Sequence, residues 1–179
     1  MHSIEYFNFK TLKYDLANKF FYKKTKRIPA IKKIILNFGC KTTEIKLLAE
    51  SLLALELITS NQGKLTTAKK INIILKIRKG NPIGCKVTLQ KKQMFNFLEK
   101  IFINIFPNIK NFTGIKLNKN IDTKALSYQL CDTLHFDGLE EHYYSFNNLP
   151  NLNITILTNV KNKKELMFIL KSIQFPIKT

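Results

Sequence analysis

The feature that most constrains how this chain folds is the alternation of apolar and polar residues in several short stretches. The alternation is clearest in residues 84–90, where the apolar members are Cys85, Val87 and Leu89. Residues 31–38, 126–135 and 152–158 alternate in the same way. Because successive side chains of a strand point to opposite faces of a sheet, each stretch predicts a strand with one buried face and one polar face. The other residues expected on buried faces are Ile34, Leu36, Phe38, Leu126, Tyr128, Leu130, Leu152, Ile154 and Ile156.

Apolar residues recur at helical spacing in three other stretches, residues 43–58, 92–106 and 163–173, and each predicts an amphipathic helix. We expect Thr42 or Thr43 to cap the first of these helices and Pro107 to end the second. Residues 1–27 predict an N-terminal helix and a basic loop. The stripe residues expected to face the core are Ile45, Leu48, Leu52, Leu55, Met94, Leu98, Ile101, Ile105, Leu166, Ile169, Leu170 and Ile173.

These elements predict an α+β fold, a single domain over residues 1–179. One-sided strands and one-sided helices pack most simply as an open, mostly antiparallel sheet with the helices on one face. The other face is then left open, and we expect it to be available to RNA. The side chains expected on this open face are Lys33, Asn37, Lys86, Thr88, Asn153 and Thr155.

The charge of the chain points to an anionic partner. Thirty Lys and Arg residues against twelve Asp and Glu give a formal charge of +18, which would oppose folding without neutralisation. Nucleic acid is the first candidate partner and an anionic membrane surface the second. Arg27 and Arg78 are the only arginines, and lysine meets phosphate as a point charge, which favours backbone contact over base reading. No apolar run is long enough to span a membrane, and we expect no membrane partner.

The sequence offers no chemistry for catalysis. Cys40, Cys85 and Cys131 are far apart and are expected to be buried or half-buried thiols, and the three histidines have no metal-ligand spacing. The acidic group Asp137, Glu140 and Glu141 is typical of a solvated loop. There is no Gly-rich phosphate loop and no nucleophile with a base. We therefore expect no enzyme activity, no metal and no cofactor.

Residues 69–82 combine charge and apolarity in a way that suits neither a core strand nor a free loop. Lys69, Lys70, Lys76, Arg78 and Lys79 share this segment with a run of isoleucine and leucine. A buried strand would bring unpaired charges to the core, at several kcal/mol each. We predict a protruding arm that RNA or tRNA covers, with a core strand as the alternative.

Four stretches together resemble ribosomal protein five of the large subunit, the family that carries 5S rRNA. The most specific is the run from Lys76 to Leu89, KIRKGNPIGCKVTL, and the others are residues 28–39, residues 65–70, and residues 152–156 with Phe175-Pro176. Their order and spacing hold from about residue 28 onward. The region around residues 125–151 departs from the family pattern, which leaves any contact it makes open.

The resemblance implies a place in the central protuberance, with the open sheet face on 5S rRNA and large-subunit rRNA. Residues 69–82 would face the peptidyl-site tRNA through Lys69, Lys70, Lys76, Arg78 and Lys79. Further partners would be neighbouring large-subunit proteins and a head protein of the small subunit. Asn61 and Gln62 are alternative matches for one family position. The side chains predicted to contact rRNA are Lys33, Asn37, Asn61, Gln62, Lys64, Thr66, Lys86, Thr88 and Thr155.

Two other functions remain as alternatives to a ribosomal role. A general RNA- or DNA-binding protein outside the ribosome would bind any duplex with little preference for 5S rRNA. An RNA-processing enzyme would need a metal or a general base, which the sequence lacks. Abundant Lys, Asn, Ile and Phe with no Trp indicates an AT-rich gene, which favours a mitochondrial ribosome and an organelle genome and leaves a plastid as the alternative.

Overall fold

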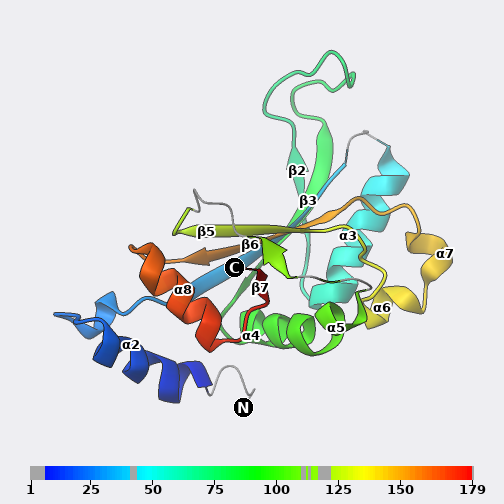
Figure 1. Ribbon diagram of the computed structural model, residues 1–179. Helices are drawn as coiled ribbons and strands as arrows, with labels where there is room; N and C mark the ends of the chain where they lie inside the picture. The colour runs from blue at the N-terminus through cyan, green and yellow to red at the C-terminus, as the bar shows by residue number, and fades with distance from the viewer. Residues whose placement is uncertain (1–6, 41–43, 110–111, 113, 117–121, 179) are drawn as a thin grey trace. The chain divides into compact units, whose positions relative to one another are not determined.

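The computed structural model describes residues 7–40, 44–109, 112, 114–116 and 122–178. The chain divides into two compact units. The first unit comprises Met1–Ile34, Gln90–Leu126 and Thr155–Thr179, and the second comprises Ile35–Leu89 and Ser127–Ile154. The architecture is α+β, as predicted, and the five-stranded antiparallel sheet is open (Figure 1). Its order is β2-β3-β1-β6-β5, with β1 (Ile31–Gly39), β2 (Lys64–Thr67), β3 (Pro82–Gln90), β5 (Ala125–Leu130) and β6 (Leu152–Thr158).

The alternation of the sequence matches the burial of most strands. In β1 the buried residues include Ile34, Leu36 and Phe38, and in β6 Leu152, Ile154 and Ile156 are buried. The strand predicted over residues 126–135 is too long, because β5 ends at Leu130 and the Asp132 side chain accepts a hydrogen bond from the Leu134 amide at 3.2 Å. That turn takes the backbone out of the sheet. Tyr128, expected in the core, is only half-buried.

The helices of the second unit are α3 (Ile45–Thr59), α6 (Asp137–Glu140) and α7 (Tyr143–Phe146). The predicted caps Thr42 and Thr43 lie outside the described residues, and the helix begins at Ile45 after Glu44. The prediction that Ile45 faces the core is wrong, since its side chain is 82% exposed in the first turn. The buried stripe of α3 is Leu48, Ser51, Ala54, Leu55 and Ile58.

The helices of the first unit come from three parts of the chain. They are η1 (Asn8–Leu12), α2 (Lys13–Lys19), η2 (Thr25–Arg27), α4 (Lys91–Lys100), η3 (Ile101–Ile105), α5 (Phe106–Asn108) and α8 (Lys163–Ser172). The predicted core residues Met94, Leu98, Ile101 and Ile105 are all buried. Pro107 does not end the helical path where predicted, because it lies in the first turn of the short helix α5, where a proline is tolerated. The short strands β4 (Ile115–Lys116) and β7 (Ile177–Lys178) pair in parallel.

The three cysteines lie in different environments. Cys40 and Cys85 are buried, as predicted, but Cys131 is exposed at the end of β5. Burial raises the pKa of the Cys85 thiol to about 12, and the nearby Cys40 adds to the effect. The Cys85 thiol is therefore neutral at physiological pH and places no negative charge in the core beneath β3.

Candidate nucleic-acid interface

The β2–β3 hairpin carries the most polar surface of the second unit. The two strands pair antiparallel, with Lys64 opposite Lys86, Leu65 opposite Cys85 and Thr66 opposite Gly84. Residues directly opposite each other share a face of the sheet, so Lys64, Lys86 and Thr66 point to the same side. Thr88, two residues beyond Lys86, lies on this side as well. Lys64, Lys86 and Thr88 are all exposed.

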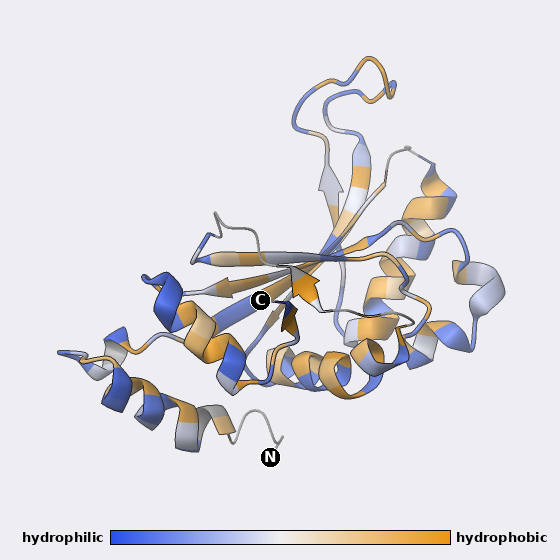
Figure 2. Ribbon diagram, viewed as in Figure 1, coloured by the Kyte–Doolittle hydropathy of each residue, from blue (hydrophilic) through white to orange (hydrophobic). Residues whose placement is uncertain are grey.

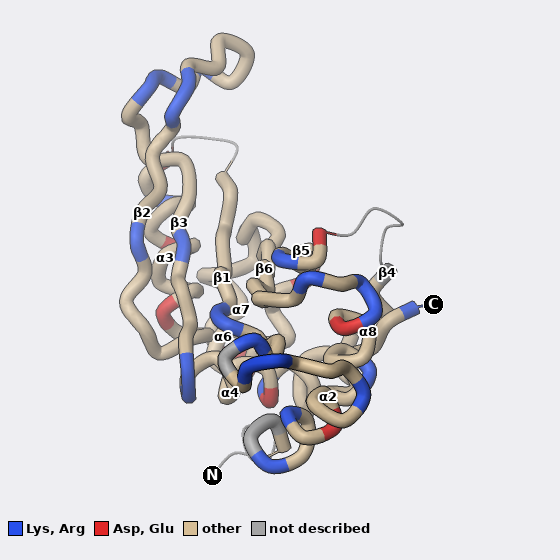
Figure 3. The backbone as a smooth tube through the Cα atoms, turned by 90° about the vertical axis from the view of Figure 1, so that its left-hand side faces the viewer, with Lys and Arg blue, Asp and Glu red and all other residues tan. Residues whose placement is uncertain are grey.

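The pairing of Lys64 with Lys86 is unfavourable in the free protein. Like charges directly opposite on one sheet face destabilise the pairing of the strands. The five strands also contain no Asp or Glu that could compensate these charges. In Figure 3 the lysines of β2 and β3 lie along the hairpin without an acidic neighbour on either strand. An anionic ligand on this face would turn the repulsion into attraction.

Asn37 extends this polar surface onto β1. Its side chain is half-buried, and its neighbours Leu36 and Phe38 are fully buried on the opposite face. Where β1 meets β3, a Cβ on Gly84 would collide with the Phe38 carbonyl oxygen and would lie 3.0 Å from the Thr66 Oγ1 atom. Glycine is therefore required at position 84. We call Asn37, Lys64, Thr66, Lys86 and Thr88 the polar sheet face.

The turn before β2 presents the two glutamine and asparagine candidates differently. It begins at Ser60, whose backbone is left-handed with φ 55°. The Asn61 amide donates to the Thr59 hydroxyl at 3.3 Å, and the Gly63 amide donates to Glu56 Oε1 at 3.0 Å. These contacts fasten the turn to α3. Asn61 is half-buried in this arrangement, whereas Gln62 is exposed.

Lys33 and Thr155 belong to the parts of β1 and β6 that lie in the first unit. Both are half-buried, and each alternates with buried neighbours: Ile34 follows Lys33, and Ile154 and Ile156 flank Thr155. Their alternation is the one predicted. The second unit brings together Asn37, Gln62, Lys64, Thr66, Lys86 and Thr88, and Lys33 and Thr155 are described separately from them.

Residues 68–81, which we call the arm, connect β2 to β3 (Figure 1). Two backbone hydrogen bonds close its neck: the Ala68 amide donates to the Asn81 carbonyl at 2.8 Å, and the Gly80 amide donates to the Ala68 carbonyl at 3.0 Å. Nearer the tip, Asn72 and Ile77 exchange two backbone hydrogen bonds of 2.9 Å. Strand β3 begins at Pro82 rather than at Gly84, so Pro82 belongs to the strand.

The arm exposes both its charges and most of its apolar residues. Lys69, Lys70, Lys76, Arg78 and Lys79 are all exposed. The side chains of Ile73 and Ile74 are 87% and 91% exposed, and Figure 2 shows the apolar tip above hydrophilic stems. Ile77 differs, since it is 5% exposed, and so it does not belong to the exposed apolar run.

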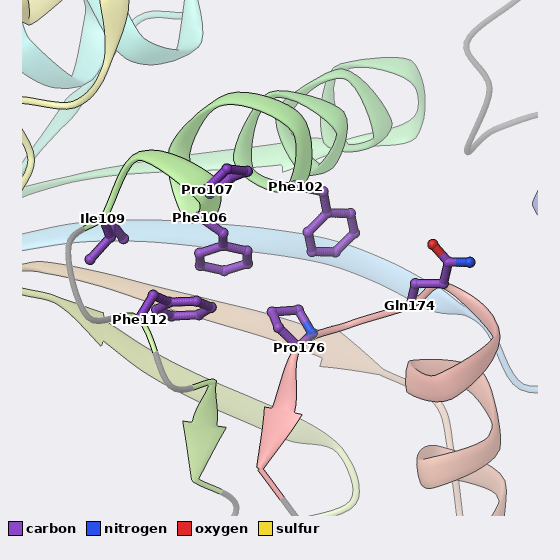
Figure 4. Close-up of a pocket in the computed structure, with 7 residues that line it drawn as sticks. All are labelled: Phe102, Phe106, Pro107, Ile109, Phe112, Gln174 and Pro176. Carbon is purple, nitrogen blue, oxygen red and sulfur yellow. The ribbon is translucent and has the colours of Figure 1, made fainter.

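A pocket in the first unit lacks the charges that phosphate binding needs. It measures about 380 Å³ and lies among the aromatic rings that follow η3 (Figure 4). The rings of Phe106 and Phe112 stack at 4.7 Å between centroids. None of its lining residues is charged: they are Phe102, Phe106, Pro107, Ile109, Phe112, Gln174 and Pro176. We assign this pocket to the packing of the aromatic cluster.

Two searches of the described residues bear on other functions. Within the described ranges, no group of three or more His, Cys, Asp and Glu side chains could hold a metal ion. None of the helices that the structure describes is long and apolar enough to cross a membrane.

Sequence reasoning missed part of the polar surface. Ser127 and Gln129 of β5 are exposed and alternate with the buried Leu126 and Leu130, yet the prediction considered only the apolar members of this strand. Asn153 of β6 is half-buried, as expected for its side of the strand. The signal that identifies all three is the same alternation that placed Thr88.

Comparison with known proteins gives a consistent result over almost the whole chain. A profile of the C-terminus of the ribosomal protein five (uL5) family matches residues 82–177. The large ribosomal subunit protein uL5m of Reclinomonas americana is 37% identical over 168 residues, covering 93% of this chain and 92% of that protein. The uL5 protein of Blochmanniella floridana is 32% identical, covering 92% and 87%. The uL5 protein of Nitrosomonas europaea is 32% identical over 178 residues, covering 98% and 97%.

Proposed function

Because the chain belongs to the uL5 family of large-ribosomal-subunit proteins, we propose that it binds 5S rRNA in the central protuberance through its polar sheet face. Proteins of this family are structural and not enzymes, and membership implies rRNA and ribosomal proteins as partners. The proposal goes further in naming the RNA and the surface that contacts it.

The observation that carries the proposal is the pairing of Lys64 with Lys86 on a sheet that lacks acidic residues. The two lysines would neutralise phosphates and release counterions, which is the main source of affinity in such complexes. Asn37, Thr66 and Thr88 would fix the register by hydrogen bonds to sugar, phosphate or base edges. Lys33 and Thr155 would add contacts on the same strands.

Of the two candidates in the turn, we assign the RNA contact to Gln62. Its side chain is exposed, whereas that of Asn61 is half-buried in a turn fastened to α3. An exposed amide can reach a ligand without disturbing the turn, and it can both donate and accept hydrogen bonds.

The arm is the part that we propose to face the peptidyl-site tRNA. Its exposed cations, Lys69, Lys70, Lys76, Arg78 and Lys79, suit a phosphate backbone. Its exposed apolar tip suits packing against unpaired or minor-groove surface of an RNA. We propose contacts with neighbouring large-subunit proteins and with a head protein of the small subunit as the remaining part of the same location.

We also propose that the protein works in a mitochondrial ribosome. The uL5m protein of Reclinomonas americana is a similar relative, and the Lys-, Asn- and Ile-rich composition agrees with an AT-rich organelle gene. The bacterial relatives are nearly as similar, at 32% identity, so the composition contributes as much to this proposal as the similarity does.

The test is to purify the tagged full chain from its own cell and to sequence the RNA that accompanies it. We expect 5S rRNA to be enriched over other structured RNAs. The affinity should fall by about 0.7–0.9 log units per log unit of salt for each phosphate neutralised. A general nucleic-acid-binding protein would instead exchange 5S rRNA for any duplex competitor at equal concentration, and that result would overturn the proposal.

A further inference from the structure

A second cationic surface lies in the first unit, away from every residue that the sequence predicted to bind RNA. It is a groove of about 650 Å³ between the end of α2 and one side of α8. Its rim carries the lysines Lys19, Lys163, Lys164 and Lys171, and its floor includes Phe20 and Phe168. This volume is within the range of small-ligand sites, roughly 300–1,000 Å³.

The floor of this groove is aromatic and partly open. The rings of Phe20 and Phe168 meet edge to face, with 6.0 Å between centroids and an interplanar angle of 76°. The Lys19 Nζ atom lies 4.5 Å from the centroid of the Phe168 ring. Phe20, Met167 and Phe168 are each half-buried, so part of each side chain remains available to a ligand. A flat apolar ligand with an anionic edge fits such a floor.

The rim lysines are placed where the helix itself does not favour them. Lys163 and Lys164 lie in the first turn of α8, where the helix dipole favours anions and disfavours cations. The acidic residue of that turn, Glu165, is 7% exposed and accepts a hydrogen bond from the Asn162 side chain at 3.4 Å. Its charge also helps burial raise the pKa of Tyr22, so the carboxylate lies beside Tyr22. The four exposed lysines therefore dominate the charge of the rim.

We propose that this groove binds one unpaired nucleotide of large-subunit rRNA, with the base on Phe168 and the flanking phosphates on the rim lysines. Unpaired bases stack on aromatic side chains while cationic grooves follow the backbone, and the groove offers both features in one place. An acidic protein segment would use the lysines but has no need of an open aromatic floor. The inference rests on the proposed function, because it takes the ribosome as the source of the RNA.

The direct test places a photo-crosslinking amino acid at Met167 of the full chain, assembled into large subunits. A second preparation carries it at Thr88, on the polar sheet face. The groove proposal predicts a crosslink from Met167 to a nucleotide of large-subunit rRNA. A crosslink from Met167 to a protein, or to nothing while Thr88 crosslinks to rRNA, overturns the groove proposal alone. Failure of both positions to reach rRNA also overturns the proposed function.

A binding test separates the base contact from the phosphate contacts, with a fluorescein-labelled oligouridine as the probe. Phe168→Leu keeps the floor apolar but removes the ring, and should weaken binding by about 5- to 150-fold, the effect of losing one stacked base. The pair Lys163→Gln and Lys164→Gln should lower the salt slope by about 1.4, since each phosphate on a single strand contributes about 0.7.

The matched control is the pair Lys92→Gln and Lys100→Gln on α4. Both lysines are exposed, and neither lies in the groove or among the predicted RNA contacts. Removing these two charges should change the salt slope by less than half as much as the groove pair. An equal change in the control, or unchanged affinity in Phe168→Leu, would show that oligouridine does not use the groove.

Discussion

The polar sheet face and the arm belong to one hairpin, yet they expose opposite kinds of side chain. On the face, amides, hydroxyls and lysines are carried by strands whose apolar side chains are buried: Phe38 is 0% and Val87 3% exposed. In the arm, Ile73 and Ile74 are 87% and 91% exposed, although the segment is strongly basic. The two surfaces are joined at Ala68 and Asn81 by the hydrogen bonds of the neck.

This difference indicates two ways of meeting RNA. The face is held by a paired sheet with a packed core beneath it, so little conformational entropy is lost when a ligand binds. The arm has one small bridge between Asn72 and Ile77, and its apolar tip stays in water at a cost of about 25 cal/mol for each Å². We therefore expect the face to bind as it stands and the arm to become ordered on its partner.

The largest effect should come from the core beneath the face. Phe38→Ala removes a fully buried ring from β1, and we expect it to lower the free energy of unfolding by about 3–5 kcal/mol. Urea denaturation of the full chain measures this change. The neighbouring Asn37→Ala is the matched control, since its side chain lies on the other face of the same strand. A loss below about 1 kcal/mol for Phe38→Ala would mean that the face has no rigid support at this point.

A smaller effect is expected on the face itself, and in RNA binding rather than in stability. Asn37→Ala and Thr88→Val should each weaken 5S rRNA binding by roughly 1 kcal/mol, the net contribution of one hydrogen bond. Filter binding gives the affinity, and thermal unfolding checks the fold. Thr67→Val is the control, because Thr67 is exposed on β2 but lies outside the polar sheet face. If stability falls as much as affinity does, Asn37 and Thr88 serve the core and not the RNA.

The smallest effect should be found at the tip of the arm. Ile73→Ser and Ile74→Ser should change the free energy of unfolding of the isolated protein by less than about 0.5 kcal/mol, as at other exposed positions. Ile77→Ser is the matched comparison, because Ile77 is 5% exposed and should cost distinctly more. Chemical denaturation of the three variants side by side decides the point. Equal losses at Ile73 and Ile77 would show that the tip packs against the protein.

The sequence predicted the fold well wherever one physical pattern acted alone. Strands β1 and β6 follow strict alternation, and their buried residues include all the predicted ones. The errors occur where local chemistry competes with the pattern, as at Asp132, whose turn shortens β5, and at Pro107, which is tolerated by starting a short helix. Ile45 continues the helical spacing of α3 but lies in the first turn, beyond the reach of the core.

The candidate site was predictable in part. Alternation places Lys86 and Thr88 on one side of β3, but it does not show that Lys64 lies opposite Lys86, because the register of a hairpin depends on the whole arm between the strands. The groove beside Phe168 could not be found from the sequence, since Lys19 and Phe168 are far apart in the chain. Only the packing of α2 against α8 brings a lysine over that ring.

The measurement that tests the contrast between face and arm most directly is amide hydrogen exchange, followed in the free protein and in assembled large subunits. In the free protein we expect residues 69–81 to exchange fast, while amides of β3 from Cys85 to Leu89 exchange slowly because they are paired in the sheet. In the large subunit the arm should become protected, with little further change in β3. Strong protection of residues 69–81 in the isolated protein would contradict this account, because the arm would then be a packed element that needs no partner.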